Sequence, residues 1–268
     1  MNISFIGGGV MAEAIIGGIL GQGIATATDI CVGEPVESRR AALSDRYGVS
    51  TTASNGEAAG HGRLVVLSVK PQQLDRVLGE LRGKLEASQA VISIIAGARM
   101  NSIVAGLEHE AVIRVMPNTP AQIGVGMSVW TASPSVNSKH TEATRSILET
   151  LGEELYVDDE RYIDMATALS ASGPAYVFLF MESLVDAGVT LGMTPEMARK
   201  LTLQTVLGSA RLVQETGKDP AELRDMVTSP GGTTAEALRA LEAGGFRATV
   251  LDAVTAAYEK AKQLGEEK

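Results

Sequence analysis

The segment that decides the fold is Ile3–Leu20, which reads ISFIGGGVMAEAIIGGIL. Its first four residues suit a buried strand, and a helical pattern starts just after the three glycines. Gly7, Gly9 and Ala12 have the spacing G-x-G-x-x-A, which binds the pyrophosphate of a dinucleotide when it joins a strand to a helix. Gly7 permits the tight turn, Gly9 lets the pyrophosphate approach the backbone, and Ala12 allows the helix to pack closely on the strand. The segment therefore predicts a dinucleotide-binding domain.

Short apolar segments alternate with helical patterns from Asn2 to about Val157. The segments ISFI, ICVG, LVVLSV, AVISII and AVIRVM are rich in Val and Ile, which is typical of parallel strands buried on both faces. Amphipathic stretches lie between them, for example at Pro35–Tyr47 and Pro71–Leu81. This alternation predicts an α/β domain with a doubly wound, Rossmann-type parallel sheet over residues 1–158.

The second half of the chain has a different pattern. Strand patterns stop after the acidic run from Asp158 to Glu160, and helical patterns follow. The predicted helices run from near Pro174 to Ala187, from Thr194 to Gly217, over a few residues after Pro220, and over Thr234–Leu241 and Phe246–Leu264. We therefore expect an all-α second domain over residues 159–268.

One helical segment of this domain, PAYVFLFMESLVDAGV from Pro174, is apolar around its whole circumference. Such a helix on the outside of a small domain leaves a large apolar patch, so we expect a partner subunit to cover it. The uncharged run Met165–Met181 is interrupted by serines, a glycine and a proline, and a membrane span needs about 20 apolar residues. We therefore interpret it as a buried helix of a soluble homo-oligomer.

Composition restricts the kinds of partner. The net charge of -9 disfavours nucleic acid. The single cysteine, Cys31, forms no internal disulfide framework, and the scattered His61, His109 and His140 lack the spacing of zinc ligands. The start MNISFIGGGV reaches its glycines too early for a signal peptide. A metal-free, reduced, cytoplasmic protein is the expectation.

The end of the second predicted strand bears on the choice of dinucleotide. Glu34 lies 25 residues beyond Gly9, where a carboxylate accepts hydrogen bonds from the ribose 2′-hydroxyl and repels a 2′-phosphate. This position favours NADH. Arg39 and Arg40 follow closely and could instead bind the phosphate of NADPH if Glu34 turned away. Both cofactors stay open at this point, with NADH favoured.

Other strand ends carry glycine or polar residues that suit a cofactor rim. They are SVKP (Ser68–Pro71), IAG (Ile95–Gly97) and VMPNTP (Val115–Pro120). In open parallel sheets, ligands bind beyond the carboxyl ends of the strands. The predicted cofactor contacts are therefore the glycine-loop residues Gly7, Gly8, Gly9, Val10, Met11 and Ala12, together with Glu34, Val69, Lys70, Pro71, Ala96, Gly97 and Asn118.

A second glycine-rich segment, TSPGGTTAEALRAL, begins at Thr228. The Ser-Pro-Gly sequence predicts a turn, since proline presets one dihedral angle and glycine reaches positive φ without strain. Thr233 and Glu236 have the spacing of a capping box, which predicts that a helix starts here with free backbone N–H groups. Such a helix end attracts anions.

Five segments together resemble the Δ1-pyrroline-5-carboxylate reductase family: FIGGGVMAEAI, LSVKPQ, RVMPNTP, LSASGPAYVF and DMVTSPGGTTAEAL. The resemblance runs from Ile3 to about Ala261. The chain departs from the family at Ala171, where glycine is usual, and at Glu34, where relatives often carry Ser or Thr. The resemblance implies hydride transfer from NADPH or NADH to the imine carbon of pyrroline-5-carboxylate, giving L-proline. It also implies a helical domain that interlocks with a second subunit and dimers that assemble further.

The resemblance also implies site residues. It assigns substrate binding to Ser229, Gly231, Gly232, Thr233 and Thr234, and a hydrogen bond from Thr234 to the ring nitrogen. We expect Thr234 to orient the substrate rather than to act as a general acid, because its hydroxyl is far too weak an acid. Asn55 matches a family asparagine near the adenine ribose. Lys70, Ala96 and Asn118 match positions toward the nicotinamide.

Two other functions compete with this interpretation. β-Hydroxyacid dehydrogenases share a similar domain pair but use a catalytic lysine soon after a glycine-rich helix entry, whereas here no lysine follows Gly173 until Lys200. Glu182 remains an unassigned carboxylate for which an interface hydrogen bond is the favoured role. A non-catalytic nucleotide sensor is the second alternative, and it has no need of the anion site at Thr228–Thr234.

Overall fold

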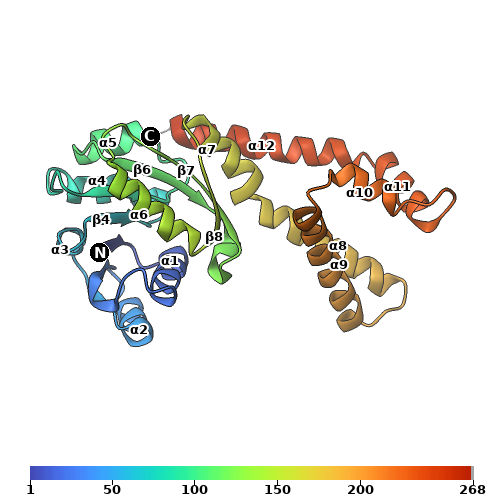
Figure 1. The fold of residues 1–268 in the computed structure, drawn as a ribbon, viewed down its shortest axis with the longest axis horizontal. Helices are drawn as coiled ribbons and strands as arrows, with labels where there is room; N and C mark the ends of the chain where they lie inside the picture. Colours follow the sequence, from blue (N-terminus) through green and yellow to red (C-terminus); the bar gives the residue numbers. More distant parts are fainter. Residues whose placement is uncertain (267–268) are drawn as a thin grey trace. The chain divides into compact units, whose positions relative to one another are not determined.

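A computed structural model of the chain describes residues 1–266 (Figure 1). The strands in this part form one sheet in the order β3-β2-β1-β4-β5-β6-β7-β8. Their bounds are β1 (Ile3–Ile6), β2 (Ile30–Gly33), β3 (Ser50–Thr52), β4 (Leu64–Leu67), β5 (Ala90–Ser93), β6 (Val112–Pro117), β7 (Gly126–Ala132) and β8 (Gly152–Tyr156). Neighbouring strands from β3 to β6 are all parallel, which confirms the predicted Rossmann-type sheet.

The five predicted strands are β1, β2, β4, β5 and β6, and three further strands were not predicted. β3 and β8 lie at the sheet edges and are largely exposed, so neither carries an apolar run. β7 pairs antiparallel with β6 and parallel with β8. The parallel sheet therefore ends in one antiparallel pair, which the βα alternation of the sequence did not indicate.

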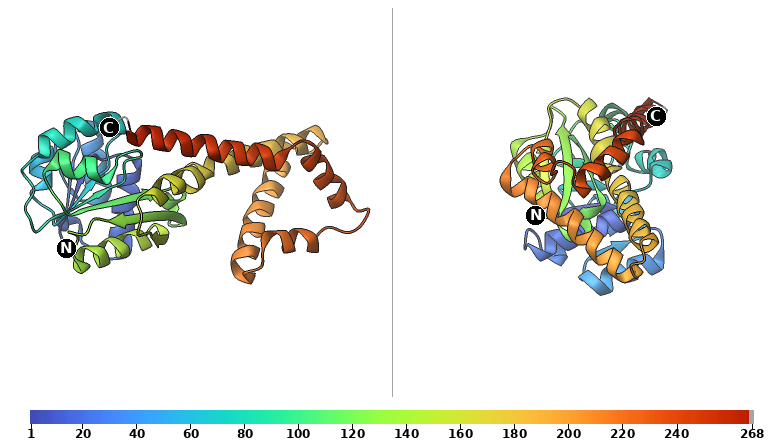
Figure 2. Two further views of the ribbon diagram at one scale, coloured as in Figure 1. Left: turned by 90° about the horizontal axis from the view of Figure 1, so that it is seen from above. Right: turned by 90° about the vertical axis from the view of Figure 1, so that its right-hand side faces the viewer.

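Helices cover both faces of the sheet (Figure 2). One face packs against residues of α1 (Val10–Gly21), α2 (Glu37–Tyr47) and α6 (Ser138–Glu149). The other packs against α3 (Asn55–Ala59), α4 (Leu74–Leu81) and α5 (Met100–Leu107). Short 3₁₀ turns are η1 (Ala27–Asp29), η2 (Pro71–Gln73) and η3 (Thr119–Ile123).

The strands have two buried faces because successive side chains point to opposite sides. On β4, Leu64 and Val66 join the core under α1, whereas Val65 and Leu67 join the core under α4. All four side chains are fully buried. This arrangement explains why the sequence shows continuous Val and Ile runs in place of alternation.

From Arg161 to the end of the described chain the structure is helical, as predicted. The helices are α7 (Arg161–Ala166), a π-helical turn η4 (Thr167–Ala171), α8 (Gly173–Thr190), α9 (Pro195–Thr216), α10 (Pro220–Met226), α11 (Thr233–Ala243) and α12 (Phe246–Glu266). Contacts within the chain divide it into two units. One contains residues 1–172 together with the carboxyl-terminal end from Ala256, and the other is Gly173–Thr255. The predicted division between residues 158 and 159 therefore remains a proposal.

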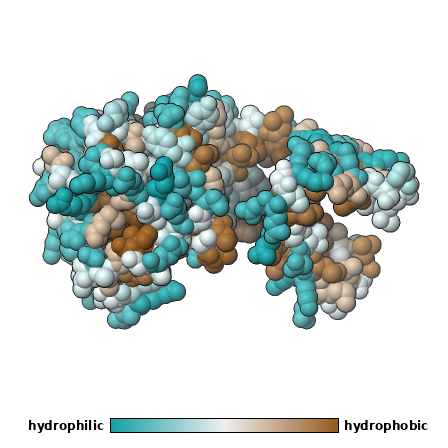
Figure 3. Space-filling view, viewed as in Figure 1, coloured by the Kyte–Doolittle hydropathy of each residue, from teal (hydrophilic) through white to brown (hydrophobic). Residues whose placement is uncertain are grey.

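Helix α8 has no buried residue within this chain. Phe178 and Leu179 are 60% and 63% exposed, and Figure 3 shows uncovered apolar side chains over α8 and α9. The π-turn carries the helix past Ser170, so Arg161–Thr190 is by length and composition long and apolar enough to cross a membrane. The expectation that this run is too short was thus wrong for the helix taken alone. A helix whose apolar face is covered by a partner subunit also meets this criterion of length and composition.

Arg114 of β6 is the largest buried charge near the sheet end. Its side chain is 1% exposed, and its guanidinium contacts Glu160 at 2.7 Å and Asp164 of α7 at 2.8 Å. Removing one partner of a buried ion pair leaves charge without compensation. These contacts tie α7 to the strand that leads to Asn118.

We expect Asp164→Asn to lower the free energy of unfolding by about 3 kcal/mol, because Arg114 loses a buried counter-charge. Chemical denaturation followed by circular dichroism measures the change. The matched control is Arg161→Gln, which breaks the exposed pair with Asp159 and is expected to cost less than about 1 kcal/mol. Equal effects of the two substitutions would show that burial of the ion pairs of Arg114 adds nothing to the free energy of unfolding.

Candidate functional site: a dinucleotide crevice and an anion-binding turn

The glycine loop after β1 has the geometry that its sequence predicts. Gly7 has φ +98°, and a Cβ there would lie 2.8 Å from the carbonyl oxygen of Ser68, so only glycine fits. A Cβ on Gly9 would meet no atom within 4 Å, which leaves this side of the loop open. Ala12 is fully buried under the sheet. Among the described residues, no hydrogen bond is made by the backbone N–H groups of Gly9, Val10 or Met11, which begin α1.

Glu34 lies beside this loop at the end of β2. Its carboxylate accepts hydrogen bonds from the N–H of Gly8 at 2.9 Å and from the N–H of Val36 at 3.0 Å. The side chain therefore has not turned away from the loop. The two amides hold a negative charge at the strand end where the adenosine ribose binds in this fold.

Arg39 and Arg40, the two candidate phosphate ligands, are both occupied. Arg39 donates from Nε to the carbonyl of Gly8 at 2.5 Å and also contacts Glu13 of α1. Arg40 donates to the carbonyls of Glu34 and Pro35 at 2.7 and 2.9 Å. Both guanidinium groups thus brace the backbone around the loop.

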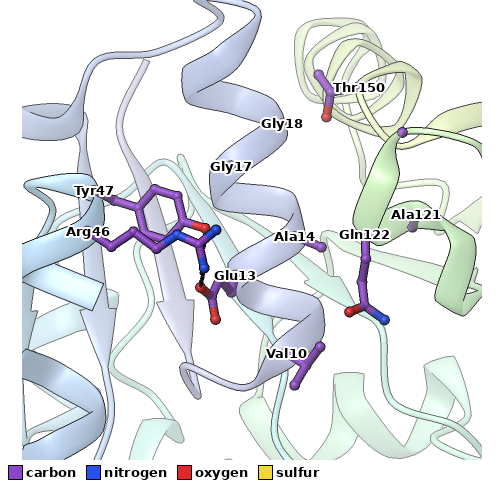
Figure 4. Close-up of a pocket in the computed structure, with 11 residues that line it drawn as sticks. Val10, Glu13, Ala14, Gly17, Gly18, Arg46, Tyr47, Ala121, Gln122 and Thr150 are labelled. Atoms are coloured by element: carbon purple, nitrogen blue, oxygen red, sulfur yellow. Dashed lines mark hydrogen bonds and ion pairs between the residues drawn. The ribbon is translucent and has the colours of Figure 1, made fainter. Parts of the chain in front are cut away.

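Glu13 is the centre of a charged cluster on the flank of α1 (Figure 4). Its carboxylate is bound by Arg39, by Arg46 at 2.8 Å and by the hydroxyl of Tyr47 at 3.2 Å. The hydrogen bond from Arg39 is the main cause that lowers the pKa of Glu13. The carboxylate is therefore ionised at neutral pH. It lines a cavity of about 520 Å³ with Ala14, Gln122 and Thr150.

The end of β4 closes the turn from the other side. The Ser68 hydroxyl donates to the carbonyl of Gly7 at 2.7 Å, and Val69 packs against Gly7. Lys70 is exposed and precedes the η2 turn that starts at Pro71. Asn55 begins α3 beside Gly33 and donates to Glu80 at 2.6 Å. Ser68, Val69 and Lys70 therefore lie at the carboxyl end of β4, as predicted, and Asn55 follows the carboxyl end of β3.

The predicted contacts after β5 and β6 differ in accessibility. Ala96 is half-buried, whereas Gly97 is buried and a Cβ there would lie 2.7 Å from Leu264 of α12. The end of α12 therefore covers Gly97. Asn118 accepts from the N–H of Met127 at 2.9 Å and donates to Ser170 of the π-turn at 3.3 Å. Its amide is fixed by these contacts.

The segment Thr228–Thr234 forms the predicted turn. The N–H of Gly232 donates to the carbonyl of Ser229 at 3.0 Å, with Pro230 second in the turn and Gly231 third at φ +69°. This is a type II turn, which needs positive φ at its third position. Because Gly232 is engaged, the backbone N–H groups of this segment that have no partner among the described residues are those of Ser229, Gly231, Thr233 and Thr234.

The prediction of a capping box at Thr233 and Glu236 was wrong. The helix is capped by Gly232, no side chain caps it, and Thr233 is its first residue. Glu236 is instead bound by Arg239. The turn places glycine at the cap, so the first helical amides remain open without a side chain folded over them. The anion-attracting character of this end is therefore retained.

Each of the two units has a site that fits one class of ligand. The open face at Gly9, the unpaired amides of α1 and the fixed carboxylate of Glu34 fit the pyrophosphate and ribose of a nicotinamide dinucleotide. The open amides at Gly231, Thr233 and Thr234 fit a small carboxylate. Within residues 1–266 no group of three or more His, Cys, Asp or Glu side chains could hold a metal ion.

The role of Glu13 does not follow from any sequence motif. The residue stands inside the glycine fingerprint, but its partners lie on α2, 26 to 34 residues away. Its spacing from Arg39 carries no motif. The only available signal was an acidic residue in the first turn of a helix that binds an anion, where a neighbouring cation is needed to balance the charge.

Two protein-family profiles match the chain. The profile described as pyrroline-5-carboxylate reductase dimerisation matches residues 160–264. The profile described as NADP oxidoreductase, coenzyme F420-dependent, matches residues 2–97. The matches correspond to the helical part and to the glycine-loop half of the sheet.

Full-length relatives agree with the first profile. Pyrroline-5-carboxylate reductase of Synechocystis is 43% identical, over 99% of this chain and 98% of its own length. The solved reductase of Coxiella burnetii has a TM-score of 0.90 and 39% identity, covering 98% of both chains. Plasmodium falciparum pyrroline carboxylate reductase, solved with NADP bound, has a TM-score of 0.90 and 34% identity, covering 99% of this chain and 98% of that one.

Proposed function

The chain belongs to the pyrroline-5-carboxylate reductase family, and we propose that its Ser229–Thr234 turn binds the acid group of the substrate of that reaction. The enzyme transfers a hydride from NAD(P)H to the imine carbon of Δ1-pyrroline-5-carboxylate and forms L-proline, the last step of proline biosynthesis. Its full-length curated relatives are named as pyrroline-5-carboxylate reductases, and not as β-hydroxyacid dehydrogenases or nucleotide sensors.

The observation that supports this substrate site is the set of open amides at the start of α11. The N–H groups of Gly231, Thr233 and Thr234 have no partner among the described residues. Hydrogen bonds from such groups to a carboxylate contribute roughly 1.5 to 3 kcal/mol each. Ser229 and Gly232 form the turn that keeps these amides open. A fixed acid group leaves the planar ring only a few orientations, which favours reaction.

Thr234 is proposed as the residue that orients the ring nitrogen. It is the second residue of α11, so it belongs to the same helix end as the open amides. The imine nitrogen carries its proton over much of the accessible pH range. Reduction therefore needs no acid as weak as a threonine hydroxyl, and the Thr234 side chain serves as a hydrogen-bonding and positioning group.

The first unit is proposed to hold the cofactor, which supplies the hydride when bound. The loop Gly7–Ala12 receives the pyrophosphate, and Glu34 and Asn55 border the adenosine ribose. Val69, Lys70, Pro71, Ala96 and Asn118 extend toward the nicotinamide. Gly97 is proposed to support Ala96 from behind, because Leu264 covers it.

NADH is the proposed physiological reductant. The Glu34 carboxylate is held at the ribose end of the crevice by two amides, and Arg39 and Arg40 are engaged with the backbone and with Glu13. A carboxylate in this position accepts from a 2′-hydroxyl and repels a 2′-phosphate. The identity of residue 34 thus supports a preference that the family relationship does not decide.

A homodimer that assembles further is proposed for the working enzyme. The dimerisation profile covers α8, whose apolar side chains are exposed in the single chain. A second copy that covers them accounts for this face without a membrane. Glu182 on this helix is proposed to form an interface hydrogen bond. We place the enzyme in the cytoplasm, with no nucleic acid partner.

We expect the purified protein to oxidise NADH in the presence of pyrroline-5-carboxylate, and to reduce NAD+ with proline at alkaline pH. Absorbance at the reduced-nicotinamide band follows both directions. NADH should give the higher kcat/KM because Glu34 disfavours a 2′-phosphate. Absence of turnover in both directions would favour a nucleotide sensor. A preference for NADPH above about tenfold would reject the role given to Glu34.

A further inference from the structure

Two opposite charges lie on the two sides of the Gly8 residue. The carboxylate of Glu34 accepts from its N–H at 2.9 Å, and the guanidinium of Arg39 donates to its carbonyl at 2.5 Å. No ion pair joins Arg39 to Glu34 among the described residues. Arg39 is drawn instead to Glu13, whose other partners are Arg46 and Tyr47. Glu13 of α1 thereby neutralises Arg39, one of the two arginines that could bind the phosphate of NADPH.

We propose that Glu13 is a positioning residue that sets the preference for NADH over NADPH, by holding Arg39 against the glycine loop and away from the ribose end of the crevice. The inference rests on the proposed use of a nicotinamide dinucleotide and adds a second determinant to Glu34. Glu34 disfavours a 2′-phosphate directly. Glu13 acts indirectly, because it withholds the cation that would bind that phosphate.

The contacts of Arg39 explain why the Glu13 carboxylate alone is enough to hold Arg39 at the glycine loop. Arg39 makes bonds to the Gly8 carbonyl, to the Gly9 carbonyl at 3.4 Å and to Glu13, and the Glu13 side chain is only 18% exposed. The ion pair is therefore partly shielded from solvent. Without the Glu13 charge, Arg39 keeps only neutral acceptors. It then becomes available to a dianionic phosphate, for which an arginine fork is well suited.

Arg40 does not replace Arg39 in this role. Its guanidinium donates to the carbonyls of Glu34 and Pro35, so it braces the turn between β2 and α2. No acidic side chain holds it there among the described contacts. The Glu13 substitution therefore changes the environment of Arg39 and leaves the contacts of Arg40 in place. This separation makes the proposal testable through one residue.

The test measures dissociation constants for NADH and NADPH with Glu13→Gln, from the fluorescence change on binding without substrate. The expected result is a shift of the affinity ratio toward NADPH by roughly five- to tenfold, since a cation near a dianion at partial exposure is worth about 1 kcal/mol or slightly more. The double variant Glu13→Gln/Arg39→Met should lose this gain, because the released cation is gone.

The matched control is Arg46→Gln. It removes a different arginine from Glu13, one that is 70% exposed, and it leaves the pair with Arg39. Its affinity ratio should equal that of the unchanged protein. Thermal unfolding of each variant identifies a general loss of structure, which lowers the affinity for both dinucleotides alike and leaves their ratio unchanged.

An unchanged ratio in Glu13→Gln, or the same gain in the variant that also lacks Arg39, would overturn the proposal. Because the binding test contains no pyrroline-5-carboxylate, it is independent of turnover. Failure of the proposed reaction would appear as missing NADH oxidation with intact binding. Failure of this inference would appear as an unmoved ratio in an active enzyme.

Discussion

Thr234→Val is expected to lower kcat for pyrroline-5-carboxylate reduction by about tenfold to hundredfold. The substitution removes the hydroxyl at nearly constant volume, and a hydrogen bond to a charged group contributes roughly 1.5 to 3 kcal/mol. The affinity for NADH should stay nearly constant, because the proposed cofactor contacts come from the other unit. Steady-state kinetics and a separate NADH titration measure the two quantities.

Thr234→Ser is the matched control for this expectation. It keeps the hydroxyl and removes only a methyl group, so kcat should remain within about threefold of the unchanged enzyme. If Thr234→Val left kcat unchanged, the hydroxyl would have no part in the reaction. If Thr234→Ser were as slow as Thr234→Val, the role of Thr234 would be packing of the helix start.

Gly9→Ala is expected to weaken NADH binding at least roughly tenfold while leaving the fold intact. The backbone of Gly9 has φ -69° and ψ -177°, which alanine adopts freely, and its Cβ would enter open space. That space is where the pyrophosphate approaches the backbone. The cost to stability should be less than about 1 kcal/mol. Isothermal titration with NADH and thermal unfolding measure the two effects.

Gly7→Ala provides the contrast. Its φ of +98° is unfavourable for alanine, and the new Cβ would lie 2.8 Å from the Ser68 carbonyl oxygen. We therefore expect a loss of stability of about 2 kcal/mol or more, together with the loss of NADH binding. If Gly9→Ala bound NADH normally, the dinucleotide would not occupy the open side of the loop.

The sequence predicted the parts of the fold that depend on local pattern. The strands β1, β2, β4, β5 and β6 have buried apolar runs because both of their faces meet helices, and all five were predicted. β3 and β8 were not predicted, since edge strands of this sheet are short, polar and exposed. Pairing of β7 with β6 depends on contacts that a single segment does not encode.

The candidate site divides in the same way. The type II turn at Ser229–Gly232 follows from the conformations of Pro and Gly alone, so the sequence predicted it. The helix cap moved from Thr233 to Gly232, because the turn delivers a glycine in extended conformation to that position. The role of Glu13 could not be predicted, since its charge partners come from a different helix. Residue types in a motif predict the class of ligand, but the pairing of charges depends on the tertiary structure.

The most direct test of the central claim is a crystal structure of the protein with NAD+ and a proline analogue whose ring cannot be oxidised. The account predicts that the analogue's carboxylate accepts hydrogen bonds from the N–H groups of Gly231, Thr233 and Thr234, with the Thr234 hydroxyl at the ring heteroatom and the ring against the nicotinamide. A carboxylate held elsewhere in every copy of the assembly, with those amides facing solvent, would contradict it.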